Sequence, residues 1–132
     1  MKRKLRKIVI EKLEYLYSVI DKYHSGTETN TLRVKVFLNG QKKTPLIIDF
    51  LTFDDYYMGQ PLNSGIDLIN KITNTFDKVN INEPKYIREL ILQGQKNGWI
   101  GSNKMEIQNG LEYLTELGYD IDKLKPLTKN KI

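Results

Sequence analysis

The sequence predicts an α+β domain in which an antiparallel sheet of four or five strands packs against two helices. Two apolar runs with strand character flank Asn39-Gly40, the dipeptide most typical of a tight hairpin. Apolar residues at helical spacing then occupy residues 84–97 and 109–117, and each stretch is followed by a glycine and an aromatic residue. At 132 residues the chain is long enough to bury one core, and we expect a single domain over residues 1–122.

Residues 5–23 fit two different structures. Apolar side chains step by four and three from Val9 to Tyr23, which is typical of an amphipathic helix. The stretch also fits a hairpin with Ile8 and Ile10 in its first strand. The second strand would then place four apolar residues on one face: Leu13, Tyr15, Tyr17 and Val19. β-branched and tyrosine residues favour strands, whereas a turn without Gly or Asn favours the helix. We predict the hairpin, in part from the resemblance described below.

The middle of the chain predicts two further strands. Apolar and polar residues alternate over residues 32–38, which predicts a strand with one buried face. Residues 46–51 are almost continuously apolar, which predicts a central strand covered on both faces. The polar stretch 24–30 predicts a loop before this antiparallel pair. Residues 52–63 predict a loop rich in aromatic and acidic side chains, and residues 65–76 fit either a strand or a helix.

Residues 84–99 carry the clearest helix pattern. Pro84 stands in the first turn, where its missing N–H costs nothing, and Gly98 fits the positive φ that commonly ends a helix. We expect Trp99 to fold back towards Gly94, where the missing side chain leaves room for an indole. The buried stripe is predicted at Ile87, Leu90, Ile91 and Gly94.

The C-terminal part predicts a short strand and a second helix. Residues 104–108 fit a strand with its apolar residues on one side. Asn109 is expected to cap the helix that follows, and Gly118-Tyr119 to end it as the first helix ends. We expect residues 123–132 to form a frayed basic tail.

The most specific motif in the chain is the run P-x-x-I-R-x-L-I-x-x-G-x-x-x-G-W. It is carried by Pro84, Ile87, Arg88, Leu90, Ile91, Gly94, Gly98 and Trp99. This run is similar to a segment of small bacterial proteins that include integron gene-cassette products and toxin-immunity proteins. The resemblance implies an N-terminal antiparallel meander before the helix, and a short strand and closing element after it. It implies no catalytic residue. Gly94 stands where that pattern has alanine, and no proline follows soon after Trp99.

The net charge of +5 is concentrated at the two ends of the chain. Residues 2–7 carry five cations and residues 123–131 carry four, so that the remaining 12 Lys and Arg face all 16 Asp and Glu. A surface that follows phosphates needs its cations on the folded body, and this distribution therefore argues against nucleic-acid binding. The alternative function that stays open is a nucleic-acid accessory protein that uses its basic ends.

The composition excludes several further classes. The chain has no cysteine, so disulfides, thiolate metal sites and a cysteine nucleophile are excluded. No stretch approaches the roughly 18 consecutive apolar residues of a membrane span. Glu11 and Lys12 interrupt the N-terminal apolar run too early for a signal peptide. We expect a cytoplasmic protein without a cofactor.

Patterns for catalysis or metal binding are also missing from the sequence. His24 is the single histidine and stands in a predicted loop, where an orienting acid and a nucleophile rarely meet. Asp54 and Asp55 are adjacent and flanked by aromatic residues, unlike the spaced ligands of a Ca²⁺ loop. No phosphate-binding glycine loop, nucleophile elbow or zinc signature occurs. We therefore predict no enzyme, no catalytic residue and no metal ligand.

One surface feature remains as a candidate site. Residues 44–70 contain four acids and no Lys or Arg. Aromatic residues are enriched at the buried centres of protein interfaces, and acids steer a basic partner towards its site. The simpler interpretation, which we favour, is that Phe53 and Tyr57 cover the open end of the sheet. The functional hypothesis is an immunity-like module that binds a protein with a basic surface through Phe53, Asp54, Asp55, Tyr56 and Tyr57. The sequence leaves the oligomeric state open.

Overall fold

The computed structural model describes residues 5–126 and confirms the α+β class. A five-stranded sheet has the order β1-β2-β3-β4-β7, and a separate two-stranded sheet pairs β5 with β6. The strands are β1 Arg6–Ile10, β2 Leu13–His24, β3 Thr29–Leu38, β4 Leu46–Phe53, β5 Ile66–Asn70, β6 Thr75–Val79 and β7 Gln108–Asn109. The helices are α1 Pro61–Ser64, α2 Pro84–Lys96 and α3 Gly110–Glu116, followed by the 3-10 turn η1 Asp122–Leu124.

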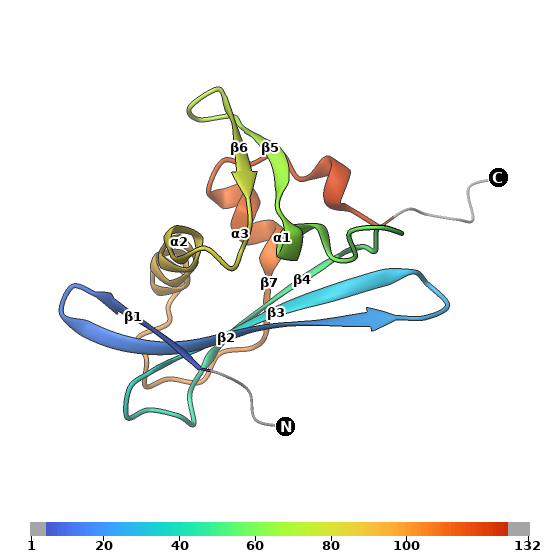
Figure 1. Ribbon diagram of the computed structural model, residues 1–132. Coiled ribbons are helices and arrows are strands. Elements are labelled where there is room, and N and C mark those ends of the chain that lie inside the picture. The colour runs from blue at the N-terminus through green and yellow to red at the C-terminus, as the bar shows by residue number, and fades with distance from the viewer. Residues whose placement is uncertain (1–4, 127–132) are drawn as a thin grey trace.

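The helices and the β5–β6 hairpin lie on one side of the five-stranded sheet (Figure 1). Val34, Ile48 and Phe50 of the sheet are fully buried and belong to the same apolar core as Ile87 and Ile91 of α2. Burial of such side chains is the main driving force for folding. The other face, which we call the open face, is covered by no helix or second sheet within residues 5–126 (Figure 1).

The N-terminal segment is a hairpin, as predicted. β1 pairs antiparallel with β2, and Ile10 lies opposite Leu13. The two residues between them have positive φ, 50° for Glu11 and 71° for Lys12. Positive φ at both positions is the geometry of a type I′ turn, which usually takes Asn-Gly. The residue types therefore gave no turn signal, because two charged residues occupy positions that favour glycine.

The central strand pair is confirmed, with Leu32 of β3 opposite Phe50 of β4. The predicted loop over residues 24–30 is shorter than expected, because His24 pairs with Thr29 and continues the ladder. The expectation that residues 46–51 are covered on both faces is wrong, since Leu51 is 45% exposed. Alternate residues of β4 lie on the open face, where no helix or strand of residues 5–126 packs against them (Figure 1).

Residues 65–76, which fit either a strand or a helix, form β5 and the start of β6. Asn70 organises the turn between them, because its Oδ1 accepts hydrogen bonds from the N–H groups of Ile72 and Thr73 at 2.9 and 3.2 Å. This side-chain geometry is the Asx turn that asparagine favours. The turn at Asn70 therefore favours two paired strands over a helix in this stretch.

α2 is confirmed, and its backbone ends as predicted. The N–H of Trp99 donates to the carbonyl of Gly94 at 2.9 Å. The expected position of the indole is wrong, because Leu46 fills the space beside Gly94, with its Cδ2 2.5 Å from where a Cβ would lie. Trp99 instead packs near Tyr15, with ring centroids 5.9 Å apart, and its Nε1–H donates to the Thr44 carbonyl at 3.1 Å.

The predicted strand over residues 104–108 is wrong. Only Gln108 and Asn109 pair with β4, and they do so in parallel, so the sheet is mixed and not purely antiparallel. Ile107 is 55% exposed and does not share a buried face. A period of two over a few residues is a weak signal, and here it is not supported by a neighbouring strand over the whole stretch.

α3 confirms its predicted cap and stop. Oδ1 of Asn109 accepts a hydrogen bond from the N–H of Leu111 at 3.0 Å, and the N–H of Tyr119 donates to the Leu114 carbonyl at 2.9 Å. The core extends past the expected boundary at residue 122, because Leu124 is fully buried. The predicted frayed tail from residue 127 onwards lies outside the described residues.

Candidate functional site

The sequence-predicted contacts lie at the end of β4, on residues 54–59, which we call the tyrosine loop. Asp55 and Gly59 exchange two backbone hydrogen bonds of 2.8 and 2.9 Å that close the loop. The Asp55 carboxylate accepts two more from the N–H groups of Tyr57 and Met58, at 2.8 and 3.0 Å. The bonds from Met58 and Tyr57 hold the pKa of Asp55 below its usual value, because they favour the charged form. The loop is thus ordered by its own hydrogen bonds.

Tyr56 and Tyr57 project from this loop into solvent. Each is 90% exposed. Their rings meet edge to face, with centroids 4.9 Å apart and planes at 86°. The interpretation that Tyr57 covers the open end of the sheet is therefore wrong. Phe53 ends β4 opposite Thr29 and is half-buried, so the five predicted contact residues do not share one environment.

Gln60 anchors the tyrosine loop and was missed by sequence reasoning. Its side chain is buried, and Nε2 donates to the carbonyls of Asn30 and Phe50 at 3.1 and 3.2 Å. Its Oε1 accepts from the N–H of Leu62 at 2.8 Å, which caps α1. One amide thus joins β3, β4 and α1 beneath the loop. No local pattern distinguishes such a glutamine from a solvated one.

The four acids of residues 44–70 do not form one patch. Asp49 accepts two hydrogen bonds from Arg33 on the open face, at 2.8 and 2.9 Å. Asp67 lies on β5, in the other sheet. Of the predicted acids, only Asp54 and Asp55 belong to the tyrosine loop. Proximity in sequence overstated the acidic cluster, because strand residues alternate between faces.

A third acid joins the tyrosine loop from a distant part of the chain. The Asn30 amide donates to Asp54 at 2.9 Å and to Asp21 of β2 at 3.3 Å. The pairing of β2 with β3 brings Asp21 to this position, and the local sequence carries no sign of it. Asp21 and Asp54 therefore share one amide donor at the start of the tyrosine loop, next to Asp55.

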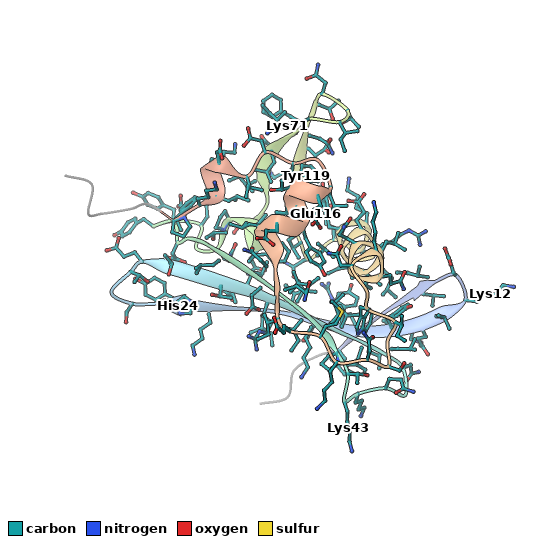
Figure 2. The ribbon with its side chains drawn as sticks, turned by 180° about the vertical axis from the view of Figure 1, so that it is seen from behind. Lys12, His24, Lys43, Lys71, Glu116 and Tyr119 are labelled. Carbon is teal, nitrogen blue, oxygen red and sulfur yellow. The ribbon has the colours of Figure 1, made fainter. Side chains whose placement is uncertain are left out.

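The open face contains a hollow with a volume of about 420 Å³. Its lining comes from three adjacent strands: Ser18, Ile20, Lys22 and His24 of β2, Thr31, Arg33 and Lys35 of β3, and Ile47 and Asp49 of β4. His24, placed by the sequence in a loop, ends β2 (Figure 2), and its Nε2 lies 2.7 Å from Oγ1 of Thr31. Sequence reasoning missed this surface, because its residues come together only through strand pairing.

The basic N-terminal segment is partly used within the fold. Nη2 of Arg6 donates to the Asn82 carbonyl at 3.0 Å, and its guanidinium lies 5.1 Å from the Tyr17 ring centroid. Lys7 pairs with Glu14 at 2.9 Å. These two cations therefore stabilise the hairpin and its contact with the loop before α2. Residues 2–4 lie outside the described residues.

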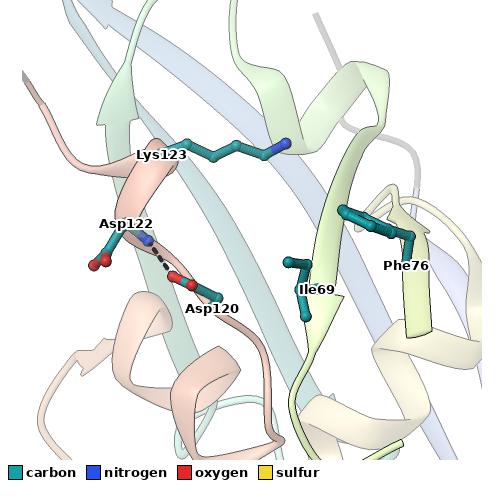
Figure 3. A pocket seen from close by; sticks show the side chains of 5 residues that line it. All are labelled: Ile69, Phe76, Asp120, Asp122 and Lys123. Carbon is teal, nitrogen blue, oxygen red and sulfur yellow. Dashed lines mark hydrogen bonds between the residues drawn. The ribbon is translucent and has the colours of Figure 1, made fainter. Parts of the chain in front are cut away.

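Two smaller hollows flank the β5–β6 hairpin. The first, of about 170 Å³, is lined by Ile69, Phe76, Asp120, Asp122 and Lys123 (Figure 3). Its volume is well below the roughly 300–1,000 Å³ of ligand pockets. The second, of about 310 Å³, includes Glu89 and Tyr119. Burial raises the pKa of both groups, and the Tyr119 hydroxyl donates to Asp77 at 3.0 Å. This side of the fold therefore favours neutral forms of the phenol and carboxyl.

Within residues 5–126, no group of three or more His, Cys, Asp and Glu side chains is arranged to hold a metal ion. No helix in the same range is long and apolar enough to cross a membrane. Comparison with protein-family models, with curated proteins and with solved structures found no match.

Proposed function

We propose that this chain is a protein-binding module that uses the tyrosine loop to contact a partner with a basic surface. The observation that carries the proposal is the exposure of Tyr56 and Tyr57, 90% each, on a loop closed by four internal hydrogen bonds. Large aromatic side chains are normally buried or scattered singly on a surface. Two of them held side by side in water are typical of a contact that is completed by a partner.

The order of the loop supports this proposal on energetic grounds. Association costs the entropy of every side chain and loop that it immobilises. Here the Asp55 hydrogen bonds and the Gln60 anchor fix the loop before binding. Tyrosine also buries a large area for the loss of only two side-chain torsions. The pair can therefore supply affinity at a low entropic cost.

The acids around the tyrosine pair favour a positively charged partner. Asp54 and Asp21 accept hydrogen bonds from the neutral Asn30 amide, and Asp55 accepts from backbone N–H groups. Within residues 5–126, no ion pair neutralises these three carboxylates. Their charge remains available to steer a basic partner, an effect that acts mainly on the association rate.

The first test is capture of a partner from the native host. The wild-type chain and a Tyr56→Ala/Tyr57→Ala variant are used as baits with chemical cross-linking. We expect a partner that the wild type retains and the variant loses, since hot-spot aromatics cost at least about 2 kcal/mol when truncated. A matched control, Ile72→Ala/Phe76→Ala, removes two exposed apolar side chains of the β5–β6 hairpin and should retain the partner. Equal recovery by both double variants would exclude the tyrosine loop as the contact.

Asp55 provides a sharper test, because its structural and electrostatic roles can be separated. Asp55→Asn removes the charge, yet its amide oxygen can accept the same two N–H bonds. We expect this variant to associate more slowly with the captured partner and to dissociate at the wild-type rate. Asp55→Ala should also dissociate faster, because the loop loses two hydrogen bonds. Surface plasmon resonance with the purified partner measures both rates, and identical kinetics for all three chains would remove Asp55 from the proposal.

We further propose an immunity-like role, in which the tyrosine loop occludes a functional surface of its partner. The support is the resemblance of residues 84–99 to a segment of toxin-immunity proteins. A toxic product encoded directly beside this gene, neutralised by the wild type and not by Tyr56→Ala/Tyr57→Ala, is the expected finding. Neutralisation by the double variant would contradict it.

A further inference from the structure

The hollow on the open face carries an excess of positive charge. Lys22, Arg33 and Lys35 line it together with one acid, Asp49. That acid accepts hydrogen bonds from Nε and Nη2 of Arg33, at 2.8 and 2.9 Å, and so is already paired with one of the three cations. Within residues 5–126, no carboxylate forms an ion pair with Lys22 or Lys35. Two ammonium groups therefore face the hollow without a matching negative charge.

Strand register brings these cations close together. Arg33 and Lys35 are two residues apart on β3, so they share the open face at a spacing of about 6.8 Å. Lys22 of β2 lies opposite Thr31 of β3 and is therefore diagonal to Arg33. Like charges on neighbouring strands oppose folding. A face that served only solubility could avoid this cost by alternating the signs of its charges.

The remaining lining residues suit a nucleic-acid strand. Thr31 and His24, whose side chains lie 2.7 Å apart, offer a hydroxyl and an imidazole, groups that bond to phosphate and sugar oxygens. Ile20 lies opposite Arg33 and Ile47 lies opposite Lys35, and both offer apolar surface to unstacked bases. A flat or protruding basic patch would suit a lipid surface, but this site is hollowed. Cations with apolar side chains beside them on the neighbouring strands fit a chain that alternates phosphates and bases.

We propose that the open face binds single-stranded nucleic acid, with Lys22, Arg33 and Lys35 contacting phosphates. The charge distribution along the sequence argues against such binding because it shows no basic cluster on the body of the chain. The fold makes that cluster, since Asp21, which is adjacent to Lys22 in sequence, points to the opposite face of β2. This proposal does not depend on the tyrosine loop, because it rests on residues of the open face alone.

Fluorescence anisotropy with a labelled single-stranded oligonucleotide of about 12 residues, within the usual range of site sizes, tests the proposal. The variant Lys22→Gln/Lys35→Gln removes the two unmatched charges. The control Lys42→Gln/Lys43→Gln removes the same charge from the exposed loop between β3 and β4, where Lys43 lies far from His24 (Figure 2). Thermal unfolding verifies that both variants fold. We expect at least tenfold weaker binding for the first and wild-type binding for the control.

Salt dependence gives a second readout. Each phosphate contact on a single strand contributes about −0.7 to the slope of log K against log salt. Removal of Lys22 and Lys35 should therefore make the slope shallower by about 1.4 over roughly 50 to 200 mM salt. The control should keep the wild-type slope. An equal loss of affinity and slope in both double variants would show that only net charge matters and would overturn the proposal.

Competition separates the single strand from other phosphate sources. We expect an unlabelled strand to displace the probe at a lower phosphate concentration than a duplex of the same sequence or inorganic phosphate. The physical reason is that only unstacked bases reach Ile20 and Ile47. Displacement by the duplex or by phosphate at the same concentration of phosphate groups would overturn the assignment to a single strand, and so would the absence of any binding by the wild type.

Discussion

Glu11 and Lys12 hold the β1–β2 turn in an unfavourable backbone conformation. Their φ values of 50° and 71° lie in the left-handed region, which costs a residue with a Cβ about 1–2 kcal/mol. The turn survives because the ladder from Arg6 to Ile10 and the core on one side fix the register. Local strain is here offset by cross-strand pairing.

Lys12→Gly should therefore stabilise the protein. Glycine adopts positive φ without the Cβ penalty, and we expect a gain on the order of 1 kcal/mol, reduced in part by the larger entropy of the unfolded chain. Urea unfolding measures the change. Lys43→Gly is the control, because Lys43 has no positive φ and should gain nothing. A Lys12→Gly variant that unfolds at lower urea than the wild type would contradict the assigned turn.

At the scale of elements, α2 approaches the sheet at Gly94. A Cβ at this position would lie 2.5 and 3.2 Å from the two terminal methyl groups of Leu46 on β4. The absence of a side chain therefore sets how closely the helix packs on the strand. The resemblance described above expects alanine at this position, and the close contact explains why this chain has glycine.

Gly94→Ala should destabilise the protein by about 1–3 kcal/mol, the usual cost of overpacking a core. Leu46→Val removes part of the opposing side chain and should recover some of that loss when combined with Gly94→Ala. Gly98→Ala is the control, because no atom lies within 4 Å of its added Cβ and its cost arises from φ of 116° alone. Urea unfolding of the four chains measures the coupling. Strict additivity of Gly94→Ala and Leu46→Val would show that the two residues do not meet.

The whole molecule has one layer of helices on one face of a sheet, and this asymmetry determines where charge can be buried. Glu89 of α2 is half-buried and lines the hollow of about 310 Å³ together with Tyr119. Burial raises its pKa above the usual value of 4.5, with the neighbouring Asp77 adding to the effect and Lys85 opposing it. The folded state therefore holds this proton to a higher pH than the unfolded state does.

Stability should fall as the pH rises from about 4.5 through the folded-state pKa of Glu89, because the unfolded chain loses its proton first. Glu89→Gln removes this dependence and should melt above the wild type at pH 7. The gain should be below about 1 kcal/mol, since the group is partly solvated, and it should vanish under acidic conditions. Glu106→Gln, on an exposed loop, is the control and should change neither the melting temperature at pH 7 nor its dependence on pH. A lower melting temperature for Glu89→Gln at pH 7 would contradict the raised pKa.

Features that depend on residues close in sequence could be predicted. The helix stops at Gly98 and Gly118, the Asn109 cap and the β3–β4 pair follow from steric preference and from short-range periodicity. The exposure of the tyrosine pair could not be predicted, because the same composition fits a loop that closes the core. The deciding facts were the backbone ladder between Asp55 and Gly59 and the Gln60 anchor.

The sequence by itself determined the α+β class, the ends of α2 and α3 and the β3–β4 pair, since each rests on conformational preference and periodicity among residues close in the chain. Only the tertiary structure decided which face of the sheet is covered, which residue fills the space at Gly94 and which charges meet. The physical reason is that strand pairing and helix docking join residues far apart in the chain, and side-chain contacts follow from that geometry. Both proposed surfaces, the tyrosine loop with Asp21 and the cationic hollow of the open face, are products of this long-range assembly.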